Sequence, residues 1–205
     1  MRADYLPIEQ YKPIMKRMQY DNRLCMELML ETGLRIDDAL SIKTDSLKGT
    51  TIHYTAKKTG KAGSAKISAS LAKKLKKNSS KEWLFPSPYN GGKKHKTRQA
   101  VFIDLKKSMI EDIKMGNITS NISPHSTRKT FAVNERKKGG LERAQASLQH
   151  ADISTTLLYA LSDLDMEKTG NLDVEALAGK VAERVFALIM PEIRSLFVDL
   201  KSTIG

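Results

Sequence analysis

Side chains that could hold a phosphate lie at the start of a helix predicted after residue 122. Ser123 is a favourable N-cap, and Pro124 suits the first helical position. His125 and Arg128 would then share one face of the first turns, where free backbone N–H groups and the helix dipole attract an anion. The spacing therefore favours a phosphate site. The alternative is a capped helix whose histidine and arginine face solvent.

A second histidine and a tyrosine follow further along the chain. His150 and Tyr159 are nine residues apart, which places them about 180° out of phase on one continuous helix. They can share a site only if the chain bends between them. Asp152 and Ser154 both favour helix caps, so a bend there is credible.

Arg35 lies near the start of a short helix predicted over residues 34–40, after Gly33 has ended the preceding helix. A cation in a first helical turn is mildly unfavourable because of the helix dipole. Arg35 should therefore face an anion or pair with a neighbour such as Asp38. The remaining alternative is a solvent-exposed arginine.

A hairpin with lysines at its tip is predicted over residues 51–68. Residues 51–56 alternate as in a strand, with Ile52 and Tyr54 on one face, and residues 64–68 form the returning strand. The turn between them is basic. Such a hairpin suits contact with a nucleic-acid backbone or groove. The alternative is a lysine cluster that protects a strand edge.

The remaining pattern predicts a mainly α-helical protein with a small antiparallel β-sheet, an α+β fold. Residues 83–85 resemble a third short strand, and the basic loop 90–98 suits phosphate contact, with glycines that suggest mobility. A merely solvated loop is equally compatible with the sequence. Helices are predicted over 6–19, 22–32, 69–78, 99–115, 123–138 and 142–148, the fourth with a core stripe of Val101, Phe102, Leu105, Met109, Ile110 and Ile113.

Composition narrows the classes of partner. The 205 residues include 35 Lys and Arg against 23 Asp and Glu, a formal net charge of +12, which favours a polyanion such as nucleic acid. An anionic membrane surface is the alternative, although no apolar run could span a bilayer. The first residues lack the apolar core of a signal peptide. Cys25 is the only cysteine, which indicates a reducing compartment, and four scattered histidines argue against a zinc site.

The tail after Tyr159 has a different pattern. Residues 161–171 are polar and loop-like. Apolar residues then recur at helical spacing from Val174 to Leu188, and again beyond Pro191. These two predicted helices could pack on their own domain or dock on a neighbouring protomer.

Four of these segments together resemble the tyrosine recombinases, the phage-integrase family. Residues 32–38, Thr-Gly-Leu-Arg-Ile-Asp-Asp, resemble its first arginine motif, and residues 58–61, Lys-Thr-Gly-Lys, resemble its β-hairpin lysine motif. His125-x-x-Arg128 with residues 130–132 resembles the second motif, and residues 148–150 with 155–159 resemble the third. The chain departs from the usual pattern at Gln149, where the family usually has Gly, and at Lys129, where it often has His.

The resemblance implies a domain organisation. Residues 1–165 would form a catalytic domain of this family, and residues 166–205 a helical tail available for protomer–protomer contact. Family members usually carry a separate N-terminal core-binding domain that completes a clamp around DNA. This sequence has no counterpart of that domain before Leu6, so we expect either a stand-alone catalytic unit or a fragment.

The resemblance also implies a site-specific recombinase or integrase, of the kind carried by mobile genetic elements, that cuts and rejoins DNA through a 3′-phosphotyrosyl intermediate. Neither a metal nor a cofactor is implied. A nucleophile, a phosphate clamp and a proton donor are required. The implied roles are nucleophile for Tyr159, phosphate clamp for Arg35 and Arg128, proton donor to the leaving 5′ oxygen for Lys58, proton transfer for His125, phosphate hydrogen bonding for His150, and support for Asp38.

The implied partner is double-stranded DNA, bound weakly and in a salt-sensitive way. We further expect four protomers to assemble on DNA, with the help of an accessory DNA-binding factor. The protein is expected in the cytoplasm of a bacterium or phage-infected host, without membrane contact. Tyr159 is expected to lie away from the site in the free protein. Alternatives are a type IB topoisomerase-like enzyme and a catalytically idle DNA-binding relative. The expected DNA contacts are Lys57, Lys61, Lys93, Lys94, Lys96, Arg98 and Lys129.

Overall fold

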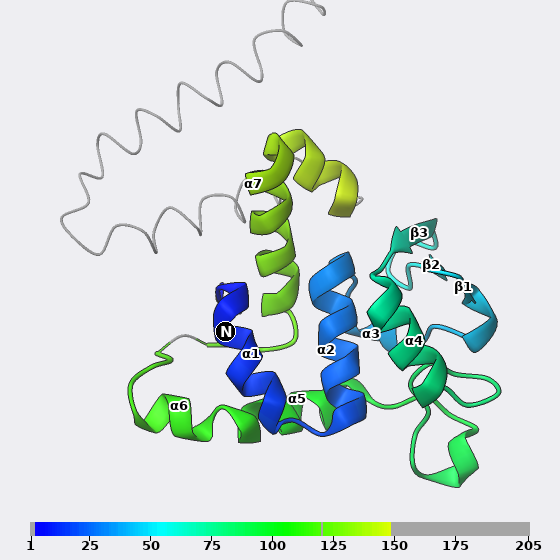
Figure 1. Cartoon of the computed structure of the whole chain (residues 1–205), viewed down its shortest axis with the longest axis horizontal. Helices are drawn as coiled ribbons and strands as arrows, with labels where there is room; N and C mark the ends of the chain where they lie inside the picture. The colour runs from blue at the N-terminus through cyan, green and yellow to red at the C-terminus, as the bar shows by residue number, and fades with distance from the viewer. Residues whose placement is uncertain (1–2, 120, 149–205) are drawn as a thin grey trace, which may run out of the picture. The chain divides into compact units, whose positions relative to one another are not determined.

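The computed structural model describes residues 3–119 and 121–148, which form a group of helices with a small sheet at one side (Figure 1). This confirms the mainly helical α+β prediction. Within these residues no helix is long and apolar enough to cross a membrane. The helices are α1 (Ile8–Arg17), α2 (Tyr20–Thr32), α3 (Ile36–Leu40), α4 (Ala69–Asn78), α5 (Arg98–Ser108), α6 (Ile110–Lys114) and α7 (Ser126–Leu148); the strands are β1 (Leu47–Lys48), β2 (Thr51–Thr55) and β3 (Ala62–Lys66); short 3₁₀ turns cover Thr44–Ser46 and Asn90–Gly92.

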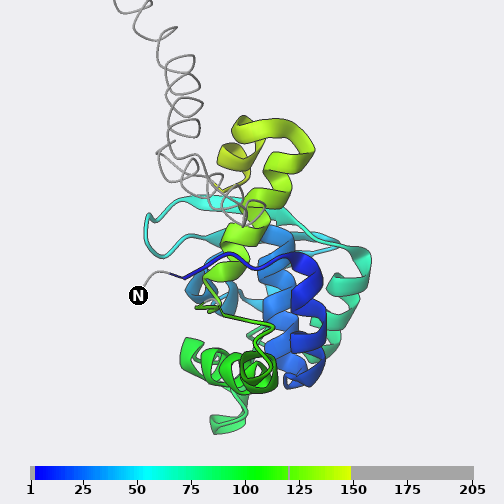
Figure 2. The same ribbon diagram turned by 90° about the vertical axis from the view of Figure 1, so that its left-hand side faces the viewer.

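Helix α2 is the central element of the fold. It contacts α1, α3, α4, α5 and α7, and Figures 1 and 2 both show it running beside α1 with α5 near their lower ends. Leu24, Cys25, Leu28 and Met29 are fully buried along it. Burial raises the pKa of the Cys25 thiol to about 12, so this thiol is a packing residue. Because α2 is surrounded, its C-terminal end at Gly33 lies inside the fold.

The sheet has the order β1-β2-β3, with both pairs antiparallel. The predicted hairpin is confirmed, with β3 beginning two residues before the predicted position, and Tyr54 lies opposite Gly63 across the strands. Ile52 is fully buried and Tyr54 half-buried, so the predicted inner face is also confirmed.

The prediction of a third strand at residues 83–85 is wrong. The third strand is β1, and residues 83–85 pair only through an isolated bridge between Lys43 and Trp83. Leu84 and Phe85 are both fully buried, so successive side chains do not alternate between core and solvent as in a strand of this small sheet. Pro86, which lacks an N–H donor, forms a second isolated bridge, with His95, and this segment does not join the sheet.

The single helix predicted over residues 99–115 is divided into α5 and α6 at Met109. Val101, Leu105 and Met109 are fully buried, as predicted. The other half of the predicted stripe is wrong, because Phe102 is 41% exposed and Ile110 and Ile113 are each 47% exposed. The turn at Met109 redirects the chain, so the apolar positions of α6 do not continue the buried face of α5.

Helix α7 begins at Ser126, two residues later than the predicted first helical position at Pro124. Pro124 and His125 form a turn before it, closed by a hydrogen bond from Ser126 N–H to the Ser123 carbonyl at 2.9 Å. The predicted interruption at residues 139–140 is confirmed, since both glycines have non-helical backbone angles and Gly140 has φ of 79°. Figure 1 shows the second part of α7 turning back beside the first.

Candidate active site

The turn after α2 places Arg35 near the start of α7. Gly33 ends α2 with φ of 67°, and its N–H donates to the Met29 carbonyl at 2.9 Å. Arg35 follows in an extended conformation at the N-terminal end of α3. A Cβ atom on Gly33 would lie 2.3 Å from Cδ1 of Phe131, so the backbone of this turn lies directly against α7. Glycine is therefore required at this position for two reasons.

Arg128 is held where α2 ends and α7 ends. Its side chain is buried, and Nη1 donates to the Gly33 carbonyl while Nη2 donates to the Leu148 carbonyl at 2.9 Å. Arg35, by contrast, is half-buried and makes no hydrogen bond or ion pair with the residues that the structure describes. One arginine is thus fixed by backbone carbonyls, and the other is available to an anion.

Asp38 joins the lysine hairpin to α3. It is 3% exposed, and its Oδ1 accepts a hydrogen bond from the backbone N–H of Lys57 at 2.9 Å. The pairing with Arg35 considered from the sequence is not among the ion pairs of the described residues. Asp38 therefore anchors the start of the basic turn, which is compatible with the supporting role expected from the resemblance.

His125 lies in the electrostatic field of both arginines. Partial burial, and then the charges of Arg128 and Arg35, lower the pKa of its imidazole, with Arg98 adding to this effect and Asp37 opposing it. Arg98 and Asp37 form an ion pair at 3.6 Å. The lowered pKa keeps His125 neutral at neutral pH, so it can accept or relay a proton.

Tyr54 was not predicted as a site residue. Burial raises the pKa of its phenol, while the charges of Arg128 and Arg35 oppose the rise and Asp38 adds to it. These influences place Tyr54 in range of the same two arginines as His125. The only sequence signal was its position on the inner face of β2 together with Ile52. Its raised pKa keeps the hydroxyl protonated and able to donate.

The lysines of the hairpin are exposed in a well-defined turn. The N–H of Gly60 donates to the Ala56 carbonyl at 2.7 Å, and the Ala56 N–H donates to the Lys61 carbonyl at 2.9 Å. Lys57, Lys58 and Lys61 all face solvent. Lys58 makes no ion pair or hydrogen bond with the described residues, so the structure leaves its ammonium free to meet a ligand.

The basic loop 90–98 divides into exposed and structural lysines. Lys93 and Lys94 are exposed, and the Trp83 indole N–H donates to the Lys93 carbonyl at 3.2 Å. Lys96 is only 5% exposed and forms an ion pair with Asp21. This burial argues against the expected DNA contact by Lys96. The loop is also fastened by backbone hydrogen bonds, which argues against the expected mobility.

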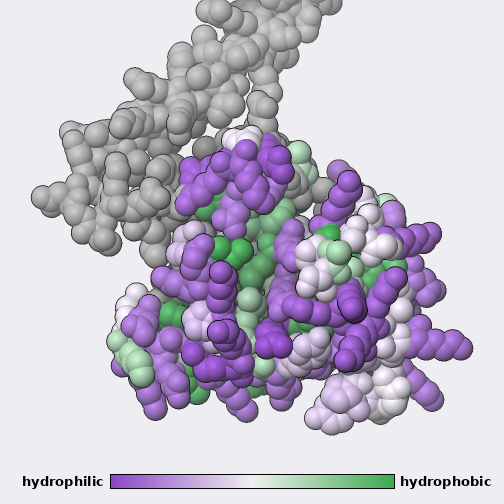
Figure 3. All heavy atoms as spheres, in the orientation of Figure 1, coloured by the Kyte–Doolittle hydropathy of each residue, from purple (hydrophilic) through white to green (hydrophobic). Residues whose placement is uncertain are grey.

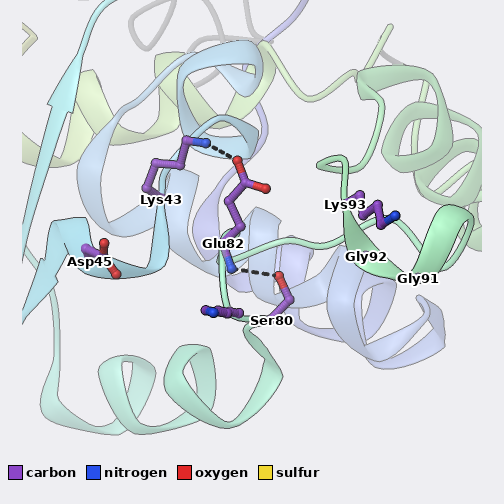
Figure 4. A pocket seen from close by; sticks show the side chains of 8 residues that line it. Lys43, Asp45, Ser80, Glu82, Gly91, Gly92 and Lys93 are labelled. Atoms are coloured by element: carbon purple, nitrogen blue, oxygen red, sulfur yellow. Dashed lines mark hydrogen bonds and ion pairs between the residues drawn. The ribbon is translucent and has the colours of Figure 1, made fainter.

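A cleft of about 630 Å³ with several charged side chains in its lining lies beside this loop (Figure 4). Lys43 forms an ion pair with Glu82 and stacks 3.7 Å above the centre of the Trp83 ring, and the Glu82 N–H donates to the Ser80 hydroxyl at 3.3 Å. The cleft includes neither arginine of the site, and its charges are partly paired within it. It is lined by Lys43, Asp45, Ser80, Lys81, Glu82, Gly91, Gly92 and Lys93.

Two of the expected catalytic residues, His150 and Tyr159, lie outside the described residues, as does the tail 166–205. Of the other positions, Lys129 is half-buried on α7. Among the described residues, the charges of Arg35 and Arg128 both act on the pKa values of His125 and Tyr54, and Asp38 accepts a hydrogen bond from the hairpin. On the face seen in Figure 3, hydrophilic side chains cover most of the described surface.

A donor-rich site of this kind, on a helical fold with a lysine hairpin, can be compared with known proteins. A model of the phage integrase family matches residues 4–165. The chain belongs to the phage integrase family. The match includes all four motifs identified in the sequence, from the Gly33 turn to Tyr159.

Relatives with curated names support this membership. The tyrosine recombinase XerD of Staphylococcus saprophyticus is 28% identical over 155 residues, covering 68% of this chain and 50% of the relative. The integrase of Escherichia phage P2 is 27% identical over 157 residues, covering 76% of this chain and 42% of the relative. The chain therefore spans about half the length of the curated relatives that it matches.

Solved structures of this family share the fold. Lambda integrase (residues 75–356), solved as a dimer bound to a COC′ core site, aligns with a TM-score of 0.63 and 19% identity over 78% of this chain and 60% of that one. The catalytic domain of bacteriophage HP1 integrase aligns with a TM-score of 0.59 and 19% identity over 78% of this chain and 89% of that one. The fold is thus that of an integrase catalytic domain.

Proposed function

We propose that this chain is the catalytic part of a site-specific DNA recombinase or integrase, which cuts and rejoins DNA strands through a 3′-phosphotyrosyl intermediate. The observation that carries the proposal is the pair of arginines at the Gly33–Phe131 contact, in the region that matches the family: Arg128 is fixed by backbone carbonyls, and Arg35 has no hydrogen bond or ion pair among the described residues. The net charge of +12 supports a polyanionic substrate.

The phosphate clamp supplies charge where the transition state needs it. Arg35 presents its half-buried guanidinium to the non-bridging oxygens, and Arg128 adds a second positive charge from a buried position. Neutral His125 lies in the field of both arginines. These groups stabilise the pentacoordinate phosphorus that forms during attack, so we propose that no metal ion takes part in this reaction.

The nucleophile and the proton donor complete the reaction. Tyr159 gives its phenolic proton to neutral His125 as its oxygen attacks the phosphorus, and a phosphotyrosyl bond replaces the bond to the 5′ oxygen. Lys58, exposed on the hairpin that Asp38 anchors, gives its proton to that leaving oxygen. A 5′ hydroxyl from another strand then gives its proton to the deprotonated Lys58 and attacks the phosphotyrosyl bond, and protonated His125 returns a proton to the leaving Tyr159 oxygen. His150 hydrogen-bonds the phosphate during both steps.

The DNA backbone is held by exposed or half-buried cations at the surface of the described residues, which position the duplex without reading its sequence. We now exclude Lys96 from this set because it is buried against Asp21. The remaining proposed contacts are Lys57, Lys61, Lys93, Lys94, Arg98 and Lys129.

A solved relative supports a proposal for assembly on DNA. One solved relative is a lambda integrase tetramer bound to a Holliday junction, and its chain aligns with this one at a TM-score of 0.60. We propose that this chain also acts as a tetramer and that its tail joins the protomers. Deleting residues 172–205 should abolish assembly on DNA while single-strand cleavage continues. Tetramers formed on DNA by the truncated protein would contradict this role of the tail.

Covalent trapping tests the central proposal. The protein is incubated with a pool of nicked duplexes that lose the 5′ hydroxyl fragment after cleavage, and denaturant-resistant protein–DNA adducts are separated by electrophoresis. Tyr159→Phe and Arg35→Ala should both abolish the adduct, whereas the wild type should form it also in the presence of EDTA. Tyr89→Phe, which changes a tyrosine that is 78% exposed, is the matched control and should form as much adduct as the wild type.

The possible outcomes separate the candidate activities. An adduct that persists in Tyr159→Phe would refute the assigned nucleophile, and an adduct that EDTA abolishes would refute the metal-free mechanism. Strand exchange between two duplexes is expected, whereas relaxation of supercoiled plasmid without exchange would indicate a topoisomerase-like enzyme. If no adduct forms with any duplex, even when a DNA-tethering domain is fused before Leu6, the chain is a binding protein.

A further inference from the structure

Helix α7 carries an ion-pair cluster across its own break. Glu135 is 7% exposed and lies before the two glycines. Its carboxylate accepts one hydrogen bond from Lys138 Nζ and one from Arg143 Nε, each at 2.8 Å. Lys138 belongs to the same helical segment as Glu135, but Arg143 belongs to the segment after the break. Of these two bonds, only the one from Arg143 joins the two segments.

Packing shows that the two segments are fitted to each other. A Cβ atom on Gly139 would lie 2.6 Å from Cδ of Arg143, so the arginine side chain lies directly across the break. Leu148 is 4% exposed and packs with Phe131 and Ala132 of the first segment. The second segment thus folds back onto the first, and the Glu135–Arg143 pair lies close to the fold point.

The end of the second segment in turn contacts a proposed catalytic residue. The Leu148 carbonyl accepts a hydrogen bond from Arg128 Nη2 at 2.9 Å, and Leu148 precedes Tyr159 by eleven residues. Any shift of the second segment would move this carbonyl. Arg128 would then lose this acceptor, which holds its guanidinium together with the Gly33 carbonyl.

The carboxylate is charged under ordinary conditions. Burial alone would raise the pKa of Glu135, but the hydrogen bonds and charges of Lys138 and Arg143 lower it overall. The Lys138 and Arg143 side chains are similarly exposed, at 62% and 54%, so their charges stabilise the Glu135 carboxylate to a similar degree. Lys138 and Arg143 differ in the segment of α7 to which each belongs. Replacing Lys138 therefore removes a positive charge from Glu135 without removing a bond between the two segments.

We propose that Glu135 and Arg143 form a positioning pair, which holds the second segment of α7, residues 141–148, against its first segment, residues 126–138, and thereby fixes the Arg128 guanidinium at the phosphate site. The inference rests on the proposed function, because Arg128 is the group that the pair positions. It assigns to two residues outside the four family motifs a control over the cleavage rate. A misplacement of about 1 Å at a reacting centre can lower a rate by about a hundredfold.

Arg143→Ala tests this pair, with Lys138→Ala as the matched control. In single-turnover trapping on nicked DNA, Arg143→Ala should lower the cleavage rate about a hundredfold, and Arg143→Lys should restore part of it. Lys138→Ala should cleave within about twofold of the wild type, because the cation that it removes does not join the segments. DNA affinity, measured at several salt concentrations, should be equal in both alanine variants.

A second measurement needs no DNA and reports on Arg128 itself. Nitrogen-15 NMR of the arginine side chains should show slow-exchanging Nη signals for Arg128, identified by their absence in Arg128→Lys. These signals should persist in Lys138→Ala and be lost in Arg143→Ala. If the wild type forms no covalent adduct, the proposed function fails while this measurement still tests the positioning pair.

Three results would overturn the inference. The first is cleavage by Arg143→Ala at the wild-type rate. The second is an equal defect in Lys138→Ala, which would indicate a general effect of removing positive charge. The third is a loss of DNA affinity in Arg143→Ala with a weaker salt dependence, which would make Arg143 a phosphate contact.

Discussion

Replacing Gly33 by alanine should destabilise the fold more than replacement of any described glycine that lies in open space. The first cost is conformational, since φ is 67° and an L-residue in this region costs about 1–2 kcal/mol. The second is steric, because the new Cβ would lie 2.3 Å from Cδ1 of Phe131, a ring that is 8% exposed. Forcing extra volume into a packed site costs about 1–3 kcal/mol.

The two costs together give about 2–5 kcal/mol, a large part of the roughly 5–15 kcal/mol that stabilises a typical domain. Gly49 provides the matched control. It has φ of 61°, but nothing lies within 4 Å of the Cβ that alanine would add. Gly49→Ala should therefore cost only the conformational part, about 1–2 kcal/mol.

Urea denaturation followed by circular dichroism measures both free energies of unfolding. The difference between Gly33→Ala and Gly49→Ala isolates the contact with Phe131. A double-mutant cycle with Phe131→Ala should recover the steric part, because the smaller side chain makes room for the new Cβ. Equal costs for the two glycine substitutions would refute the reasoning, and so would the absence of coupling to Phe131.

Three further predictions follow from single contacts. Tyr54→Phe should leave the unfolding free energy within about 1 kcal/mol of the wild type but lower the single-turnover cleavage rate about tenfold, because it removes a donor near both arginines; equal rates would contradict this. Lys96→Met should lower the free energy of unfolding by about 1–3 kcal/mol in urea denaturation, because it removes the ion-pair partner of the Asp21 carboxylate. Its DNA affinity should stay at the wild-type value, whereas Lys93→Ala should bind DNA more weakly. Glu135→Gln should lower the free energy of unfolding by about 1 kcal/mol at pH 7 in urea denaturation. This loss should shrink as the pH falls from about 5 to 3, because the folded-state pKa of Glu135 lies below the unfolded value of about 4.3 and the stabilisation is lost when the carboxylate is protonated. A loss that does not vary with pH would exclude the carboxylate charge as its source.

The sequence patterns predicted correctly several features that depend on residues close together in the chain. Gly33 ends α2 because glycine adopts the left-handed conformation, and the hairpin forms because apolar residues alternate on either side of a glycine-containing turn. The break at Gly139 and Gly140 follows from the low helical preference of glycine. Each of these features is local, so a local pattern is enough to predict it.

The predictions failed where tertiary packing decides the outcome. The periodicity that buries Val101 and Leu105 continues through Ile110 and Ile113, but the turn at Met109 leaves the last two exposed. No sequence pattern in the residues before Met109 predicts that turn.

Lys96 illustrates the same limit for charge. It belongs to a run of cations that suits DNA, yet its partner Asp21 lies 75 residues earlier in the chain. A run of like charges shows how many cations are present, but only the fold shows which of them are already neutralised. A lysine can therefore be assigned a DNA contact only where the fold also leaves its side chain exposed.

The candidate site combines both kinds of information at Gly33. As a helix cap it was predictable from its neighbours, but its carbonyl also accepts from Arg128, 95 residues later, and a side chain added at its Cα would meet Phe131. The same residue thus ends a helix, admits a neighbouring helix and holds an arginine, while Arg35 follows two positions later. Because these functions share one backbone turn, a change at Gly33 must disturb stability and the phosphate site together, whereas a change at Arg35 can affect the site alone.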